Sequence, residues 1–195
     1  MSQDKQAIRR SIRRLRKTIT PLVRKQAAKA ALKFCRKYIP LLKAKRIAFY
    51  WPMADEFDVL PMLTFWEEQG KACYLPVVPK NGRRLWFVRK DSRTRWKNNR
   101  FGIPEPIHPE RIRAEQLDVV LVPLMGIDQY GFRLGMGGGF YDTSIACRRL
   151  RNMTRPKLIG VAYELQKVNH LEADPWDIRM DALVSEKEFS VFPKN

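Results

Sequence analysis

The 195-residue chain is 45% hydrophobic, which is enough for one sizeable core and favours one domain over two. It contains no uninterrupted apolar stretch of the roughly 18 residues that a membrane span needs, and its charged start lacks the apolar core of a secretion signal. Three widely spaced cysteines, Cys35, Cys73 and Cys147, argue against a disulfide framework or a zinc site and favour a reducing, cytoplasmic location.

The net charge of +18 is concentrated in the first quarter of the chain. Residues 1–46 hold sixteen Lys or Arg against the single acid Asp4, a net charge of +15. Residues 47–195 hold 22 against 19 acids, a net charge of +3. A basic segment of this kind is compatible with RNA or DNA as a partner, so a nucleic-acid-binding module is one hypothesis.

Two basic amphipathic helices are predicted over about residues 4–38. The first carries an apolar stripe at helical spacing: Ile8, Ile12, Leu15 and Ile19. The second begins at Thr20-Pro21, an N-cap followed by a first-turn proline, and reaches about Tyr38.

Lys5, Arg9 and Arg16 fall on one flank of the apolar stripe, because each helical residue advances by about 100°. They can therefore face a shared anion. The alternative is an ordinary solvated face, which we prefer for the other cations of this segment. Arg24, on the second helix, is expected to lie away from any site.

After Arg46 short apolar runs alternate with helical patterns. Strands are expected at 47–51, 72–75, 85–88, 119–122, 158–162 and 183–184, and helices at 59–69 and roughly 141–150. This alternation predicts an α/β fold with a largely parallel sheet. Residues 89–115, rich in Arg, Asn and Pro, are expected to be mostly loop. No repeat or linker divides the chain, so 1–195 is predicted to be a single domain.

The segment from Gly131 to Asp142 contains five glycines in twelve residues and follows the strand predicted at 119–122. Ligands of open α/β sheets bind beyond the carboxyl ends of such strands. Glycines let backbone N–H groups turn toward an anion, and a following helix would add the positive end of its dipole. Arg133 offers a forked cation and Asp142 a hard oxygen ligand. The segment therefore favours a phosphate site, with a long structural turn as the alternative.

Two well-known phosphate signatures do not fit this loop. A Walker loop needs Gly-Lys followed by Ser or Thr, but Phe140 and Tyr141 follow the last glycines. The dinucleotide pattern requires glycine or alanine at position 140 and meets Phe140.

Residues 133–142, Arg-Leu-Gly-Met-Gly-Gly-Gly-Phe-Tyr-Asp, resemble the signature loop of the 5-formyltetrahydrofolate cyclo-ligases. Further stretches resemble this family in the same order along nearly the whole chain: 5–9, 50–56, 102–106, 118–123, 159–163 and 176–181. The resemblance implies a fold similar to the sugar-phosphate isomerase and CoA-transferase group, a three-layer α/β/α arrangement around a mainly parallel sheet.

The resemblance also implies a reaction. This is the ATP- and Mg²⁺-dependent closure of 5-formyltetrahydrofolate to 5,10-methenyltetrahydrofolate, with release of ADP and phosphate through a phosphorylated formyl intermediate. The folate can carry a polyglutamate tail. A nucleic-acid partner is not favoured, because neutralising a polyanion does not require the glycine loop. A different ATP-using enzyme on the same scaffold is a third hypothesis.

The resemblance assigns nucleotide binding to Lys5, Arg9, Arg133, Leu134, Gly135, Met136, Gly137, Gly138, Gly139, Phe140 and Tyr141. Arg133 and Tyr141 are the expected catalytic residues, while Phe140 is expected to pack.

Asp142 and Asp177 are expected to hold Mg²⁺, directly or through water. Read without the family, Asp142 is an early-helix acid and Asp177 a turn residue. Many relatives have His where this chain has Trp176, so no role is assigned to that position.

Trp51 and Glu56 are expected to bind the folate, Trp51 as an apolar wall and Glu56 as an acceptor for pterin N–H groups. The alternatives are a core aromatic and a surface acid. Met53 lines the pocket or is simply structural.

Overall fold

The structure, a computed structural model, describes residues 5–150 and 153–193, so residue 4 of the predicted first helix lies outside the described residues. One eight-stranded sheet forms the centre of the fold. In spatial order its strands are β13 (Phe189–Val191), β12 (Ala182–Val184), β10 (Lys157–Val161), β7 (Val119–Pro123), β1 (Arg46–Ala48), β2 (Ala72–Val77), β3 (Trp86–Lys90) and β6 (Arg111–Ile112).

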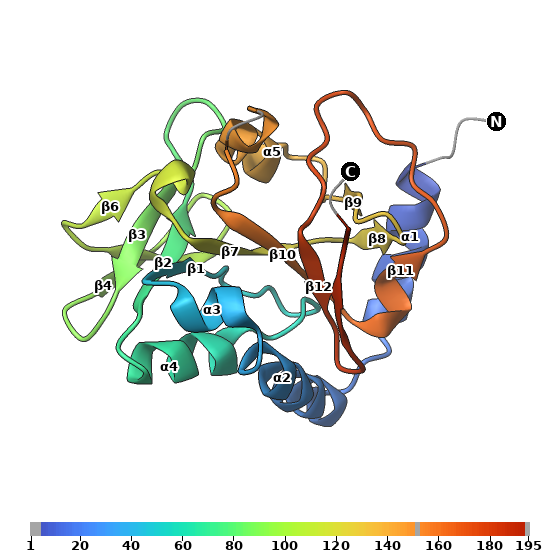
Figure 1. The fold of residues 1–195 in the computed structure, drawn as a ribbon, viewed down its shortest axis with the longest axis horizontal. Helices are drawn as coiled ribbons and strands as arrows, with labels where there is room; N and C mark the ends of the chain where they lie inside the picture. The colour runs from blue at the N-terminus through green and yellow to red at the C-terminus, as the bar shows by residue number, and fades with distance from the viewer. Residues whose placement is uncertain (1–4, 151–152, 194–195) are drawn as a thin grey trace.

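The five central strands, β12 to β2, run parallel, while β13, β3 and β6 are added antiparallel at the edges. Helices α2 (Pro21–Cys35), α3 (Ile39–Lys43) and α4 (Leu60–Glu68) cover one face, and α5 (Phe140–Ser144) lies on the other (Figure 1). The predicted α/β fold with a mainly parallel sheet is therefore confirmed. None of the helices within the described ranges is long and apolar enough to cross a membrane.

Strand β7 shows why the sheet is central. Its side chains alternate between two cores: Val119 and Leu121 pack in the core beneath α2 and α4, and Val120 and Val122 in the core on the opposite face. All four are buried, which explains their continuous apolar pattern in the sequence.

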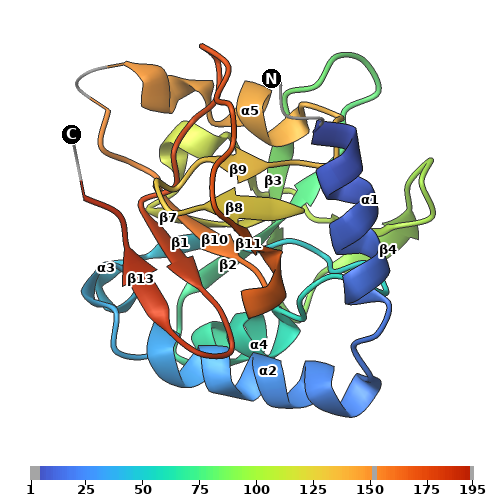
Figure 2. The ribbon, with the colours of Figure 1, turned by 90° about the vertical axis from the view of Figure 1, so that its right-hand side faces the viewer.

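Helix α1 (Lys5–Arg16) lies against one end of the main sheet, beside a small sheet of β11 (Lys167–Val168), β8 (Gly126–Asp128) and β9 (Arg133–Leu134), as Figure 2 shows. Ile12 packs there with Met125, Leu134 and Leu171. Gly126 permits this approach, because a Cβ added there would lie 3.0 Å from the Ile12 side chain. The apolar stripe of α1 thus fixes the helix next to the strand that leads into the glycine loop.

The start of α2 is confirmed, since Thr20 Oγ1 accepts the Val23 N–H at 3.3 Å and Pro21 follows as the first helical residue. Its predicted end at Tyr38 is wrong. The helix ends at Cys35, the extended backbone of Tyr38 interrupts the helical geometry, and Ile39 begins the separate helix α3 with Pro40 in its first turn.

The prediction that residues 89–115 are mostly loop missed the strands that this stretch contains. This stretch forms the hairpin of β4 (Arg95–Asn98) and β5 (Pro104–Ile107), and then β6. All of β4 is exposed, so no alternation of apolar residues marks it, and a two-stranded sheet tolerates the prolines of β5 because its edges are open. The first strand, expected at 47–51, is Arg46–Ala48.

The helix expected over 141–150 is short. It runs as α5 for five residues and is followed by a 3₁₀ turn over Ala146–Arg149. Ser144 Oγ donates to the Phe140 carbonyl at 2.6 Å and accepts the Leu85 N–H at 2.8 Å, so its side chain is tied to the neighbouring backbone where the helix ends. A helix this short adds little dipole to the glycine loop.

Candidate active site

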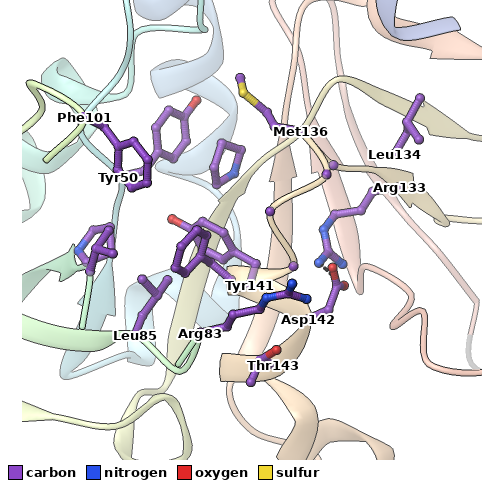
Figure 3. Close-up of a pocket in the computed structure, with 18 of the residues that line it drawn as sticks. Tyr50, Arg83, Leu85, Phe101, Arg133, Leu134, Met136, Tyr141, Asp142 and Thr143 are labelled. Atoms are coloured by element: carbon purple, nitrogen blue, oxygen red, sulfur yellow. Dashed lines mark hydrogen bonds and ion pairs between the residues drawn. The ribbon is translucent and has the colours of Figure 1, made fainter. Parts of the chain in front are cut away.

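A cavity of about 790 Å³ opens where α1, the glycine loop and the segment after β1 meet (Figure 3). This volume lies within the roughly 300–1,000 Å³ of small-molecule sites. Its lining contains every residue to which the family resemblance assigns a role: Lys5, Arg9, Trp51, Glu56, Arg133, Leu134, Gly135, Met136, Gly137, Gly138, Gly139, Phe140, Tyr141, Asp142 and Asp177. The fold thus brings all of these residues to one place, and their individual roles stay predictions.

The glycine turn, residues 135–139, is open on one side. Gly137 (φ +101°) and Gly139 (φ +67°) adopt backbone conformations that L side chains rarely take. A Cβ added at Gly135 or Gly137 would meet no atom within 4 Å. The turn therefore needs glycine for its shape and leaves its backbone accessible to a ligand.

Two cations of α1 line the cavity, and one of them contacts the glycine turn. Arg9 Nε donates to the Gly135 carbonyl at 2.8 Å. Lys5 Nζ lies 2.6 Å from Asp174 Oδ2 and 4.0 Å from Asp177 Oδ2. Helix α1 is thereby joined both to the glycine turn and to the C-terminal segment that carries Asp177.

Arg16 does not share this position, so the prediction that it faces the same anion is wrong. Its side chain is 1% exposed and pairs with Asp55, through Nε to the carbonyl at 2.7 Å and Nη2 to Oδ1 at 2.8 Å. Its Nη1 also contacts the Met125 sulfur. The last turn of α1 packs against the loop after β1, which covers this residue.

Arg133 and Asp142 form the charged centre of the cavity (Figure 3). The buried Arg133 guanidinium donates to Asp142 Oδ1 and to the Ile178 carbonyl. Asp177 Oδ2 accepts the Asp174 N–H at 2.8 Å. Asp142 and Asp177 line the same cavity with hard oxygen atoms, which suits Mg²⁺.

These carboxylates do not complete a metal site by themselves. Across residues 5–150 and 153–193 no three His, Cys, Asp or Glu side chains are grouped closely enough to hold an ion. An ion that keeps water and binds substrate phosphates does not require such a group. The two aspartates therefore fit Mg²⁺ as partial ligands.

Tyr141 presents a buried hydroxyl that has no hydrogen-bond partner among the described residues. Burial, with a smaller contribution from the Glu56 charge, raises the pKa of Tyr141 far above its ordinary value, so the phenol stays neutral and can donate. A buried polar group without a partner costs about 1–3 kcal/mol. A ligand oxygen in the cavity would remove this cost.

The opposite wall is largely apolar and holds the Glu56 carboxylate. Glu56 is 8% exposed, and its Oε2 accepts the Met53 N–H at 2.9 Å. Burial raises the pKa of Glu56, against the opposing effects of this hydrogen bond and of Arg16. Trp51 lies beside it in the lining, with its ring 5.0 Å from that of Trp96.

Several lining residues were not predicted: Arg83, Asn99, Glu105, Arg149 and Asp174. Glu105 is 3% exposed and accepts the Val78 N–H at 2.7 Å and the Asn99 amide at 2.9 Å. Its stretch, 102–106, resembles the family, so a signal for it existed. Arg83 lies in a polar turn with no pattern to distinguish it.

Arg24 also differs from expectation. Its Nη1 donates to the Ala54 carbonyl at 2.8 Å and its Nη2 to that of Met53 at 3.4 Å. It therefore supports the loop that carries Glu56 and is not remote from the cavity.

Comparison with known proteins shows that almost the whole chain matches one protein family. Residues 1–186 match the sequence pattern of the 5-formyltetrahydrofolate cyclo-ligase family. The 5-formyltetrahydrofolate cyclo-ligase of Haemophilus influenzae is 35% identical over 189 residues, which cover 94% of this chain and 98% of the relative. That of Escherichia coli is 34% identical over 179 residues, covering 89% and 96%.

Solved structures show the same likeness. The NMR structure of Aquifex aeolicus 5,10-methenyltetrahydrofolate synthetase superposes with a TM-score of 0.82 at 29% identity, covering 98% of this chain and 94% of that one. The 5,10-methenyltetrahydrofolate synthetase of Mycoplasma pneumoniae gives 0.73 at 26% identity, covering 94% and 99%.

Proposed function

The chain belongs to the 5-formyltetrahydrofolate cyclo-ligase family and converts 5-formyltetrahydrofolate to 5,10-methenyltetrahydrofolate, and from this premise we propose that the cavity is its active site. One observation carries the assignment: an open glycine turn with cations beside it shares the cavity with an apolar wall that holds a buried carboxylate. The first suits a triphosphate and the second a pterin. ATP and the folate can then meet between them.

The nucleotide half consists of the glycine turn, Lys5, Arg9 and Arg133. Backbone amides of the turn can face phosphate oxygens because no side chain shields them. Lys5 and Arg9 come from a packed helix, so little flexibility is lost when they bind an anion. Leu134, Met136 and Phe140 supply the apolar part of this half.

Asp142 and Asp177 would hold Mg²⁺, which supplies charge neutralisation for the phosphates when it is bound. Asp142 is already held in place by Arg133. Asp177 is held by its turn with Asp174.

The folate half consists of Trp51 and Glu56. The Trp51 ring offers a flat apolar surface, and the Glu56 carboxylate can accept hydrogen bonds from pterin N–H groups. Because Glu56 is buried, these bonds would form where water competes little.

The chemistry requires two bond exchanges. The formyl oxygen attacks the γ-phosphorus and ADP leaves; N10 then attacks the formyl carbon and loses its proton, and phosphate departs with the former formyl oxygen. Nucleophile and electrophile of the second step belong to one substrate, so the protein's task is alignment and charge stabilisation. Arg133 stabilises the transferring phosphoryl group, and the Tyr141 hydroxyl donates to an oxygen at the reacting centre.

Product formation tests the assignment directly. Purified protein with 5-formyltetrahydrofolate and Mg²⁺ should form the methenyl product, followed by its absorbance, only when ATP is present, and should release one phosphate for each product. Product formation without ATP would reject the proposed nucleotide role of the glycine turn. Tight, salt-sensitive RNA binding without turnover would favour the nucleic-acid hypothesis instead.

The cysteines agree with a reducing compartment, which we propose as the site of action. All three are free thiols. Burial raises the pKa of both Cys35 and Cys73 to about 12, so neither is a reactive thiolate at neutral pH.

A further inference from the structure

Arg83 differs from the other cations of the cavity in that its guanidinium is uncommitted. It lies in the turn between β2 and β3, a segment that gave no signal in the sequence. Within the residues that the structure describes, it makes no hydrogen bond and no ion pair, yet it lines the cavity. Figure 3 shows it on the side of the cavity where Tyr141, Asp142 and Thr143 lie.

The other cations in the lining are already engaged with protein oxygens. Lys5 contacts Asp174, Arg9 the Gly135 carbonyl, and Arg133 both Asp142 and the Ile178 carbonyl. Arg149 donates twice to the Trp176 carbonyl, at 2.6 and 3.1 Å. An incoming phosphate must share or displace these partners, whereas Arg83 can take a phosphate oxygen without losing a bond.

The position of Arg83 also fits the glycine turn. Its Nη1 lies 3.4 Å from where a Cβ of Gly139 would stand, and its Cδ lies 3.7 Å from the same point. Arg9 holds the turn at its first residue, Gly135. The two arginines therefore flank the turn at opposite ends.

From this placement we propose that Arg83 binds the terminal phosphate of the nucleotide. The inference rests on the proposed function of the glycine turn. The Gly139 end leads directly into Tyr141 and Asp142, where the reacting phosphoryl group is expected, so Arg83 belongs to the γ-phosphate rather than to the α-phosphate. A guanidinium there can bind two oxygens of the phosphoryl group that is transferred.

Nucleotide affinity, measured by calorimetry on the whole protein, tests this. Arg83→Ala should weaken ATP binding by about tenfold or more, the usual cost of losing a charged hydrogen bond, and change ADP binding by much less. Arg83→Lys should restore part of the ATP affinity, because it keeps the charge and loses the forked geometry.

Arg84→Ala is the matched control. Arg84 is the adjacent residue with the same charge, but its guanidinium pairs with Glu115 at 2.6 Å and does not line the cavity. It should bind ATP as the wild type does. Equal losses in Arg83→Ala and Arg84→Ala would overturn the proposal, because a general loss of charge would then explain both. Unchanged ATP affinity, or equal losses of ATP and ADP affinity, in Arg83→Ala would overturn it as well.

The experiment separates this inference from the proposed function. Wild-type protein that binds ATP while Gly135→Val does not supports the glycine turn as the nucleotide site, whatever Arg83 does. Binding of ATP by Gly135→Val at wild-type affinity would reject both assignments. The Gly135 position is suited to this test, because its backbone is unstrained and a Cβ there meets no neighbour.

Discussion

The two halves of the cavity use opposite physical means to bind their ligands. The half around the glycine turn is polar and open, and its cations other than Arg83 are held by carbonyl and carboxylate oxygens before a ligand arrives. The half around Glu56 is largely apolar, and the Glu56 carboxylate is kept 8% exposed with a raised pKa. Most cations of the first half thus have protein partners before a ligand binds, whereas the Glu56 carboxylate of the second half is desolvated by burial. Substitutions in the two halves should therefore fail in different ways.

Arg133→Ala should give the largest effect in the nucleotide half. It removes the buried cation at the phosphoryl group and leaves Asp142 without its partner. We expect turnover to fall by about a thousandfold, the size of effect seen when a preorganised charge at a reacting centre is lost. Methenyl product formation at saturating substrates measures this, with thermal unfolding as the check on folding. Wild-type turnover in a folded variant would contradict the assignment.

Tyr141→Phe tests the hydroxyl that we place at the reacting centre, between the two halves. It deletes only a hydroxyl that has no hydrogen-bond partner in the part of the chain that the structure describes, so stability should stay the same or rise by up to about 1 kcal/mol. Turnover should fall by about a hundredfold, because the hydroxyl is expected to donate only to the reacting centre. Thermal melts and kcat measured together distinguish the two roles. A loss of stability equal to the loss of activity would mean that the hydroxyl is structural.

Glu56→Gln should affect the folate half alone. We expect kcat/KM for the folate to fall by about tenfold, with the KM for ATP unchanged. The wild-type kcat/KM should decline as pH falls through the raised pKa of Glu56, because the carboxylate is then protonated and can no longer accept pterin N–H groups. The variant should lack this decline. An identical pH profile in both proteins would exclude Glu56 as the acceptor.

The same substitution has a consequence for stability. A raised pKa in the folded state means that Glu56 contributes stability below its unfolded pKa and that this is lost as pH rises through its folded pKa. Glu56→Gln should therefore raise the Tm at neutral pH relative to the wild type, and the difference should shrink in acid.

Arg24→Ala should give the smallest of these effects. Losing the bonds to the carbonyls of Met53 and Ala54 loosens the loop that carries Glu56, so the KM for the folate should rise by about two- to fivefold. Lys29→Ala is the control on the same helix, because Lys29 is exposed and its side chain makes no hydrogen bond or ion pair within the described residues. Equal kinetics in the two variants would show that the Arg24 contacts do not matter for the site.

The glycine turn could be predicted from the sequence, because its backbone conformation at positive φ requires glycine and therefore leaves a cluster of glycines in the sequence. Strand β7 was equally plain, because burial on both faces leaves an uninterrupted apolar run. Both features are determined by residues that are close together in the sequence, which is why the sequence alone predicts them.

What could not be predicted depends on contacts between distant segments. Arg16 shares a helix flank with Lys5 and Arg9. It is nevertheless buried, because the loop that contains Asp55, 39 positions further along the chain, folds over its side chain. Strand β4 is exposed throughout, so nothing in its residues marks a strand. Arg83 reaches the cavity only because the β2–β3 turn passes the glycine turn, and no periodicity shows this.

The Lys5–Asp174 bridge joins residues 169 positions apart, at the rim of the cavity. Contacts with so large a sequence separation carry the highest loop-closure cost and form late when the polypeptide folds. A substrate that contacts both α1 and the segment around Asp174 would stabilise the folded state relative to states in which α1 has detached. Nucleotide should therefore slow amide hydrogen exchange in α1 more than in α2, none of whose residues lines the cavity.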